Sequence, residues 1–162
     1  MKSIPPQEEI HMHFGQTAYD LGLNGPMTHF VTNVVARVSY SNDKFGLAFS
    51  IEMMCYSIFV YLCLPRLAGV DWSYYDVGLQ NVVSLSDALK ISNIDETERL
   101  EKYWMLCRKS DYRECGAIVR VIAEILLRHW DTFLANRSLL FPYENAGWAD
   151  MYGTNLSGLS QL

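Results

Sequence analysis

Histidines are the first residues in this sequence that could do chemistry, because imidazole binds metals and transfers protons near neutral pH. The chain has four of them, at His11, His13, His29 and His129. His11 and His13 are two residues apart, so they would not share one face of a helix. A metal site would need a third ligand, such as Glu8 or Asp20, brought in by the fold. We therefore expect no metal site, and we interpret His129 as a hydrogen-bonded core residue.

The most isolated carboxylate is that of Glu52, which lies inside the almost wholly apolar stretch of residues 45–64. A buried carboxyl group in a cleft could act as a general acid or base. The alternative is a structural ion pair, for which Arg37 in the preceding segment offers the cation, and we favour this interpretation. Glu52 and Arg37 are thus the predicted buried polar pair, and no second carboxylate can be assigned to work with Glu52.

The cysteines form no metal or redox motif. They are Cys55, Cys63, Cys107 and Cys115, at spacings of eight, forty-four and eight residues, whereas zinc and redox pairs have the CxxC spacing. Each lies in or beside an apolar pattern, so we expect buried free thiols and a reducing compartment. Residues 1–9 are not followed by the apolar segment of a secretory signal. These observations predict a cytoplasmic protein.

Charge and motifs narrow the classes of function. The chain has 13 Lys and Arg against 18 Asp and Glu, a net charge of −5 and a pI of about 5.3. The basic residues form no stripe, which argues against nucleic acid as a partner. The sequence contains no nucleophile elbow, P-loop or dinucleotide fingerprint. We therefore expect no catalytic residue and no cofactor, and the sequence favours a protein that is not an enzyme.

Two clusters of aromatic and acidic residues fall in irregular segments near turns. Trp and Tyr dominate the hot spots of protein interfaces, and neighbouring acids would suit a partner with a basic patch. The residues that we expect to contact a partner are Asp71, Trp72, Tyr74, Tyr75, Asp76, Tyr143, Glu144 and Trp148. The alternative is that these rings only cap the ends of a bundle. The clusters favour a non-enzymatic protein-binding module, such as an inhibitor, an immunity-type neutraliser or an adaptor.

The apolar spacing predicts that most of the chain is α-helical. The longest amphipathic pattern covers residues 112–135, and with the helix before it we expect an antiparallel helical hairpin over 95–135. Ser84 and Asp87 have the spacing of a capping box at the start of another helix. The segment after Pro26 is predicted as a helix, with a strand as the alternative because of its β-branched residues.

Residues 45–64 are apolar over twenty positions and end before Pro65, which predicts one long helix. The stretch is long enough to cross a bilayer. A carboxylate at Glu52, near its middle, makes such a span costly. We therefore favour a central helix covered by other helices, with a membrane-associated subunit as an alternative.

Together these patterns predict one all-α domain over residues 1–162, a five- or six-helix bundle with a central apolar helix and a C-terminal antiparallel helical hairpin. A leader helix within 1–25 and an irregular tail over 136–162 are expected at its periphery. A second functional hypothesis is a small helical enzyme or ligand-binding domain with a buried site near Glu52. The identity of a partner and the oligomeric state are not predicted.

Overall fold

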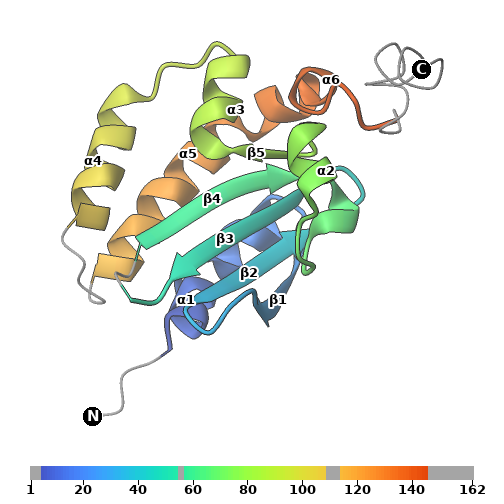
Figure 1. The fold of residues 1–162 in the computed structure, drawn as a ribbon. Helices are drawn as coiled ribbons and strands as arrows, with labels where there is room; N and C mark the ends of the chain where they lie inside the picture. The colour runs from blue at the N-terminus through green and yellow to red at the C-terminus, as the bar shows by residue number, and fades with distance from the viewer. Residues whose placement is uncertain (1–4, 55–56, 109–113, 146–162) are drawn as a thin grey trace.

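A five-stranded antiparallel sheet lies at the centre of the molecule (Figure 1). The computed structural model of the protein describes residues 5–54, 57–108 and 114–145, except for the side chains of residues 6, 74 and 75. The predicted all-α bundle is wrong, because the fold is α+β, with helices packed on a sheet.

The strands follow one another across the sheet in chain order, each antiparallel to the next. They are β1 (Asn24–Phe30), β2 (Val35–Ser41), β3 (Gly46–Glu52), β4 (Ser57–Cys63) and β5 (Val82–Ser84). Short connections join the first four strands, as antiparallel neighbours allow. β5 has three residues and pairs only with the last three residues of β4, so the first half of β4 has no strand on that side.

The apolar stretch of residues 45–64 contains β3 and β4, so the predicted central helix is wrong. Side chains at alternate positions of both strands, including Leu47, Phe49 and Val60, are buried in the core. The opposite face of β3 carries small residues such as Ala48, and these are buried as well. A strand that is covered on both faces shows no polar alternation, and its pattern cannot be told from that of a buried helix. Over the described residues, no helix is long and apolar enough to cross a membrane.

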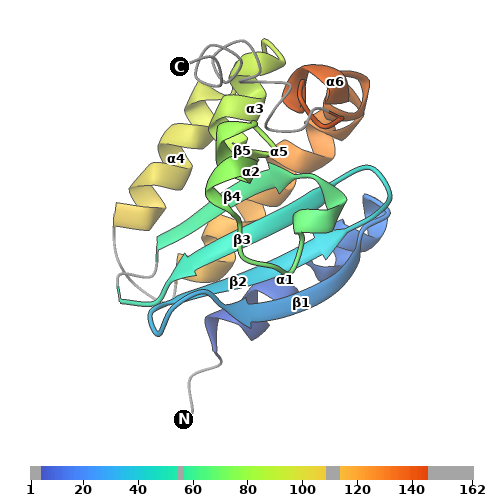
Figure 2. The ribbon, with the colours of Figure 1, turned by 45° about the vertical axis from the view of Figure 1, so that its right-hand side comes forward.

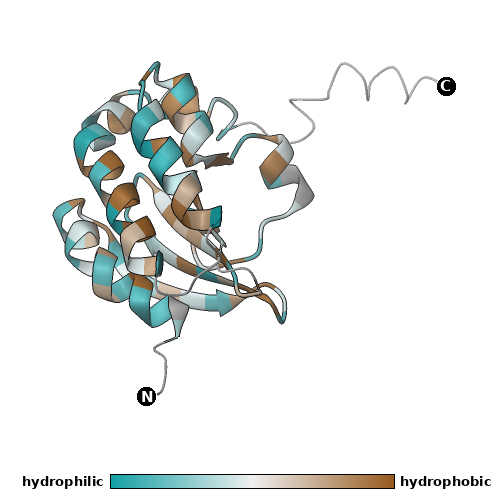
Figure 3. Cartoon of the chain, turned by 90° about the vertical axis from the view of Figure 1, so that its left-hand side faces the viewer, coloured by the Kyte–Doolittle hydropathy of each residue, from teal (hydrophilic) through white to brown (hydrophobic). Residues whose placement is uncertain are grey.

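Helices cover one face of the sheet, as Figures 1 and 2 show. They are α1 (Pro6–Asp20), α3 (Leu85–Ile91), α4 (Thr97–Arg108), α5 (Cys115–Ala135) and the short α6 (Arg137–Leu140). The long helix predicted over residues 112–135 is confirmed over Cys115–Ala135 by α5, which runs beside α4 in the opposite direction, and residues 112 and 113 lie outside the described residues. In Figure 3 these helices carry both hydrophilic and hydrophobic stretches, as expected for helices with one face on a core.

The N-terminal helix α1 belongs to this core layer. Ile10 and Phe14 are fully buried, and the Phe14 ring lies 5.2 Å from that of Tyr40 and 4.8 Å from that of Phe49. At the other end of the described chain, Phe141 is buried too. The segments around residues 10 and 141 therefore help to build the core and do not lie at its periphery.

The segment after Pro26 forms β1 and β2, so its strand interpretation is confirmed and the helix is wrong. Pro26 is tolerated because β1 is an edge strand, where a missing N–H leaves no partner unpaired. The N-cap at Ser84 is confirmed, since the backbone N–H of Asp87 donates to the Ser84 hydroxyl over 3.1 Å at the start of α3.

The connection from β4 to β5 crosses the face of the sheet that the long helices leave open (Figure 2). It contains a 3₁₀ turn, η1 (Pro65–Leu67), and a short helix, α2 (Tyr74–Gly78). Trp72 from this connection lies against the ring of Tyr61 on β4, with 5.0 Å between ring centroids. The sheet is thus partly covered on both faces.

Candidate functional site

A cavity of about 240 Å³ opens between the free half of β4 and the helices α3, α4 and α5. The described residues that line it are Phe59, Val60, Tyr61, Ser84, Leu85, Ser86, Leu100, Tyr103, Trp104, Ile122 and Ile125. Its volume exceeds the roughly 150 Å³ of an engineered core cavity that binds benzene. Protein cores are otherwise packed to crystal density, so a void of this size in an apolar environment is a candidate binding site.

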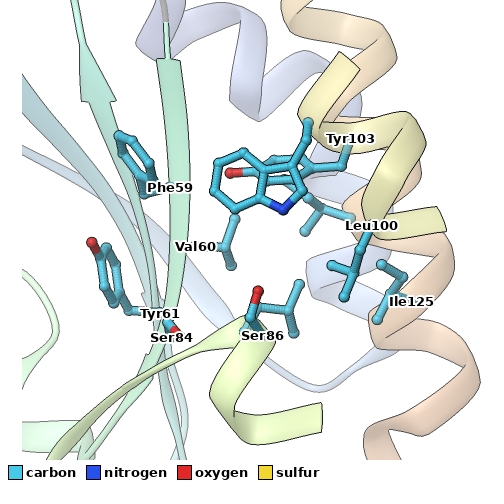
Figure 4. Close-up of a pocket in the computed structure, with 11 residues that line it drawn as sticks. Phe59, Val60, Tyr61, Ser84, Ser86, Leu100, Tyr103 and Ile125 are labelled. Atoms are coloured by element: carbon cyan, nitrogen blue, oxygen red, sulfur yellow. The ribbon is translucent and has the colours of Figure 1, made fainter. Parts of the chain in front are cut away.

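The cavity results from the short length of β5. A strand would lie about 4.8 Å from β4, whereas side chains keep a helix about 10 Å from its neighbour. Beyond the three paired residues of β5, the neighbour of β4 is α4. Figure 4 shows Leu100 and Tyr103 of α4 facing Val60 of β4 across the resulting space.

Two contacts hold α4 at this distance from β4. The Tyr103 hydroxyl donates a hydrogen bond to the backbone carbonyl of Ile58, a residue at the edge of the sheet. The Trp104 ring lies 6.4 Å from Phe59 and 4.9 Å from Tyr103, measured between centroids. Leu100, Tyr103 and Trp104 are three and four residues apart, so they share one helix face.

The chemistry of the walls suits binding rather than proton transfer. The eleven described lining residues include no carboxylic acid, histidine, lysine or arginine. The Tyr103 hydroxyl is already donating, and burial raises the pKa of Tyr103 far above its ordinary value. Ser86 brings a hydroxyl to the edge of the cavity (Figure 4). The site can accept an apolar group and offer it one or two weak hydrogen bonds.

Glu52 and Arg37, the predicted buried pair, differ in how much of each side chain is exposed to solvent. Glu52 is the last residue of β3 and is exposed, so the prediction of its burial is wrong. We expected Glu52 inside a buried helix, but it lies at the end of a strand, where the sheet meets solvent. Arg37 lies on β2 on the same sheet face and is half-buried, and the charged or titratable groups that affect its pKa are those of Asp71, Tyr61 and Cys63.

In the first aromatic cluster, the ring of Trp72 lies on the sheet and is half-buried. The guanidinium carbon of Arg37 is 3.7 Å from the centre of that ring. Asp71 is exposed, with Oδ1 3.2 Å from His29 Nε2, and Asp76 pairs with Arg66 over 2.8 Å. Burial alone would raise the pKa of Asp76, but hydrogen bonds from Ser73, Arg66 and Asn81 outweigh it and lower the pKa. The side chains of Tyr74 and Tyr75 lie outside the described part of the structure.

The second cluster is more exposed. Tyr143 is 40% exposed, and the Glu144 carboxylate accepts from Arg137 at 2.5 Å. This hydrogen bond is the main reason that the pKa of Glu144 is lowered. Trp148 falls outside the described residues. None of the cluster residues whose side chains are described lines the cavity beside β4.

Sequence reasoning missed Glu96, which is the buried carboxylate among the described residues, with 6% of its surface exposed. His129 Nε2 lies 2.6 Å from its Oε1, and Arg99 donates to its Oε2 over 2.8 Å. Burial alone would raise the pKa of Glu96, but the hydrogen bonds from His129 and Arg99 outweigh it and lower the pKa. The contact fastens the start of α4 to α5, and it fits the prediction that His129 is hydrogen-bonded.

Three of the four cysteines are described, and the expectation of buried free thiols is confirmed for them: Cys63, Cys107 and Cys115. Burial raises the pKa of Cys63 and that of Cys115 to about 12, so both stay protonated at neutral pH and are poor nucleophiles. Cys55 lies outside the described residues.

No family model, curated protein or solved structure matches the chain. Function is therefore inferred from the geometry and chemistry of the molecule itself.

Proposed function

We propose that the protein is a non-enzymatic protein-binding module, and that the cavity between β4, α3 and α4 receives an apolar side chain of a partner protein. The observation that carries this proposal is the open apolar cavity of about 240 Å³ in a closely packed core. An inhibitor, an immunity-type neutraliser or an adaptor would each use such a pocket to hold an anchor residue.

An exposed tryptophan in the cavity wall and an exposed methionine next to it in the sequence favour a protein over a small molecule. Trp104, which forms part of the wall, is 41% exposed, and the next residue, Met105, is 62% exposed. A small molecule within the cavity would leave the outer surfaces of both in water. A protein that inserts one side chain would also cover its surroundings, as the rim of an interface does.

The proposal also includes the charge of the partner and the compartment in which the protein acts. A net charge of −5 favours a partner with a basic surface, through complementarity and faster encounter. The buried free thiols support action in a reducing compartment, which we take to be the cytoplasm.

The proposal is tested by filling the cavity. Ser86→Phe places a ring in the space, and Ser86→Ala at the same position is the matched control that leaves the cavity open. A partner captured by the unmodified protein from lysate of its own source is purified, and its Kd is measured for each variant. We expect Ser86→Phe to weaken binding at least about tenfold and Ser86→Ala to leave it unchanged.

Trp104→Ala gives a second, independent readout. We expect it to weaken binding by more than about 2 kcal/mol, as truncation of a hot-spot tryptophan does. Tyr19→Ala, which removes a ring that is 79% exposed on α1, should have no effect. A folded Ser86→Phe protein that binds its partner as tightly as the unmodified protein would overturn the proposal. A small molecule that copurifies with the unmodified protein but not with Ser86→Phe would replace it with a ligand-binding function.

A further inference from the structure

The connection from β4 to β5 crosses the sheet face opposite the long helices (Figure 2). Polar side chains of the strands form a cluster on this face, next to Trp72 of the connection. Arg37 and Ser39 are two residues apart on β2, so their side chains share this face. His29 on β1 and Ser50 on β3 are the register partners of Arg37 on either side. Trp72 covers the group, with its ring centre 3.7 Å from the guanidinium carbon of Arg37.

Several hydrogen-bonding atoms in this cluster have no partner among the described residues. Ser39 is 1% exposed, and its hydroxyl oxygen makes no hydrogen bond. The Nε and Nη1 atoms of Arg37 are buried and equally unpartnered, as is Nδ1 of His29. Buried polar groups in folded proteins are nearly always hydrogen-bonded, so several unpartnered atoms in one place point to a missing ligand.

The charge of the cluster is also uncompensated at close range. Within the described residues Arg37 forms no ion pair, and Asp71, the acid whose charge acts on the Arg37 pKa, is exposed and in contact with His29. Burial lowers the pKa of the Arg37 guanidinium, and the charge of Asp71 offsets this only in part. Guanidinium has no accepting atom, so its free N–H groups can be satisfied only by an acceptor, and best by an anion.

We propose that Arg37 and Ser39 bind an oxyanion, a carboxylate or phosphate group, beneath Trp72. The two residues leave one face of β2 with their Cα atoms roughly 7 Å apart, so a group with two oxygens that lies between the side chains can accept a hydrogen bond from each. Trp72 stacks on the flat face of the guanidinium, and this arrangement leaves the N–H groups at its edges free to donate. His29, opposite Arg37, is placed to contribute a further hydrogen bond.

The covering segment rests on the sheet through Trp72, which contacts Tyr61 and Arg37, and its polar contacts must open to give the anion a way in. The Trp72 indole N–H donates to the Leu67 carbonyl over 3.2 Å, and Asp71 contacts His29 at 3.2 Å. Gly69, with a φ of +78°, lies between the 3₁₀ turn and Trp72 and allows a backbone conformation that other residues resist. Lifting residues 70–72 would open the cluster without disturbing the strands. Asp71 would repel an incoming anion, so its charge sets the affinity.

The test is a titration of the full chain with sodium phosphate and, separately, sodium acetate, at an ionic strength held constant with sodium chloride. Thermal unfolding is followed for the unmodified protein, for Arg37→Met and for the matched control Arg120→Met, an exposed arginine on α5. We expect at least one oxyanion to raise the Tm of the unmodified protein and of Arg120→Met by several degrees. Arg37→Met should show no rise, and in chloride alone it should be at least as stable as the unmodified protein.

The two titrations distinguish the sources of the anion. A response to phosphate alone assigns the site to a phosphate group, and a response to acetate alone assigns it to a carboxylate, whereas both responses mean that either group is accepted. Asp71→Asn should lower the half-saturating concentration several-fold, because it removes a repulsive charge. If Arg37→Met does not fold, Ser39→Ala takes its place and should weaken the response. The absence of any rise in the unmodified protein, or an undiminished rise in Arg37→Met or Ser39→Ala, overturns the proposal.

Discussion

At the scale of single residues, the buried carboxylate of Glu96 makes stability depend on pH. Its pKa in the folded protein is lowered, so the group contributes stability above its ordinary value of 4.5. That contribution is lost as the pH falls through the lower, folded value, because protonation breaks the contacts with His129 and Arg99. The contribution of Glu96 to stability should therefore be lost on the acid side.

This dependence can be measured as the Tm of three proteins from about pH 6 to about pH 3. Glu96→Gln should be less stable than the unmodified protein near pH 6, and its Tm should fall less steeply on acidification. Glu98→Gln alters an exposed carboxylate two residues further on, in the first turn of α4, and should follow the unmodified protein. Parallel curves for all three proteins would show that Glu96 is not the group responsible.

Residue-scale prediction from the sequence succeeded where the deciding information was local. The Ser84 and Asp87 cap was identified because its donor and acceptor are three residues apart. The buried carboxylate was assigned to Glu52 because its sequence neighbours are apolar, yet the strand ends there and exposes it. Glu96 was missed because its partner His129 is 33 residues away and reaches it only in the folded protein.

At the scale of elements, the position of α4 against β4 depends on the hydrogen bond from Tyr103 to the Ile58 carbonyl. Tyr103→Phe removes the hydroxyl and leaves a buried carbonyl unpaired, which should lower the free energy of unfolding by about 1–3 kcal/mol. Denaturant unfolding measures this change. Tyr143→Phe removes a hydroxyl from a partly exposed ring and should cost little. Equal stability of Tyr103→Phe and the unmodified protein would mean that other contacts hold α4 in place.

The helix α5 was predicted correctly from the sequence, whereas the strands β3 and β4 were not. α5 was identified because it is long and has one polar stripe, so its period of 3.6 residues is visible in the sequence. β3 and β4 were taken for one helix because Ala48 and Ser50, on the second face of β3, are also buried. The cavity could not be predicted at all, because it depends on the shortness of β5 and on the distance of α4 from β4.

At the scale of the whole molecule, the sheet should be unevenly stable. β3 has a strand on each side and six of its seven residues buried, whereas β1 is an edge strand whose residues are exposed except for His29, which is half-buried. Opening of a segment needs less free energy where fewer apolar contacts and more solvent-exposed backbone are involved. We therefore expect amide hydrogen exchange to be slowest in β3 and α5 and fastest, among the strands, in β1.

Hydrogen exchange on the dilute protein measures this gradient, and its dependence on concentration gives the control. An open edge strand can pair with another chain, which would protect its amides. If β1 exchanges as slowly as β3 at low concentration, the two strands open together and the predicted gradient is wrong. Protection of β1 that appears only at high concentration would instead show that two copies of the chain associate through this edge, since the protection would then require a second molecule.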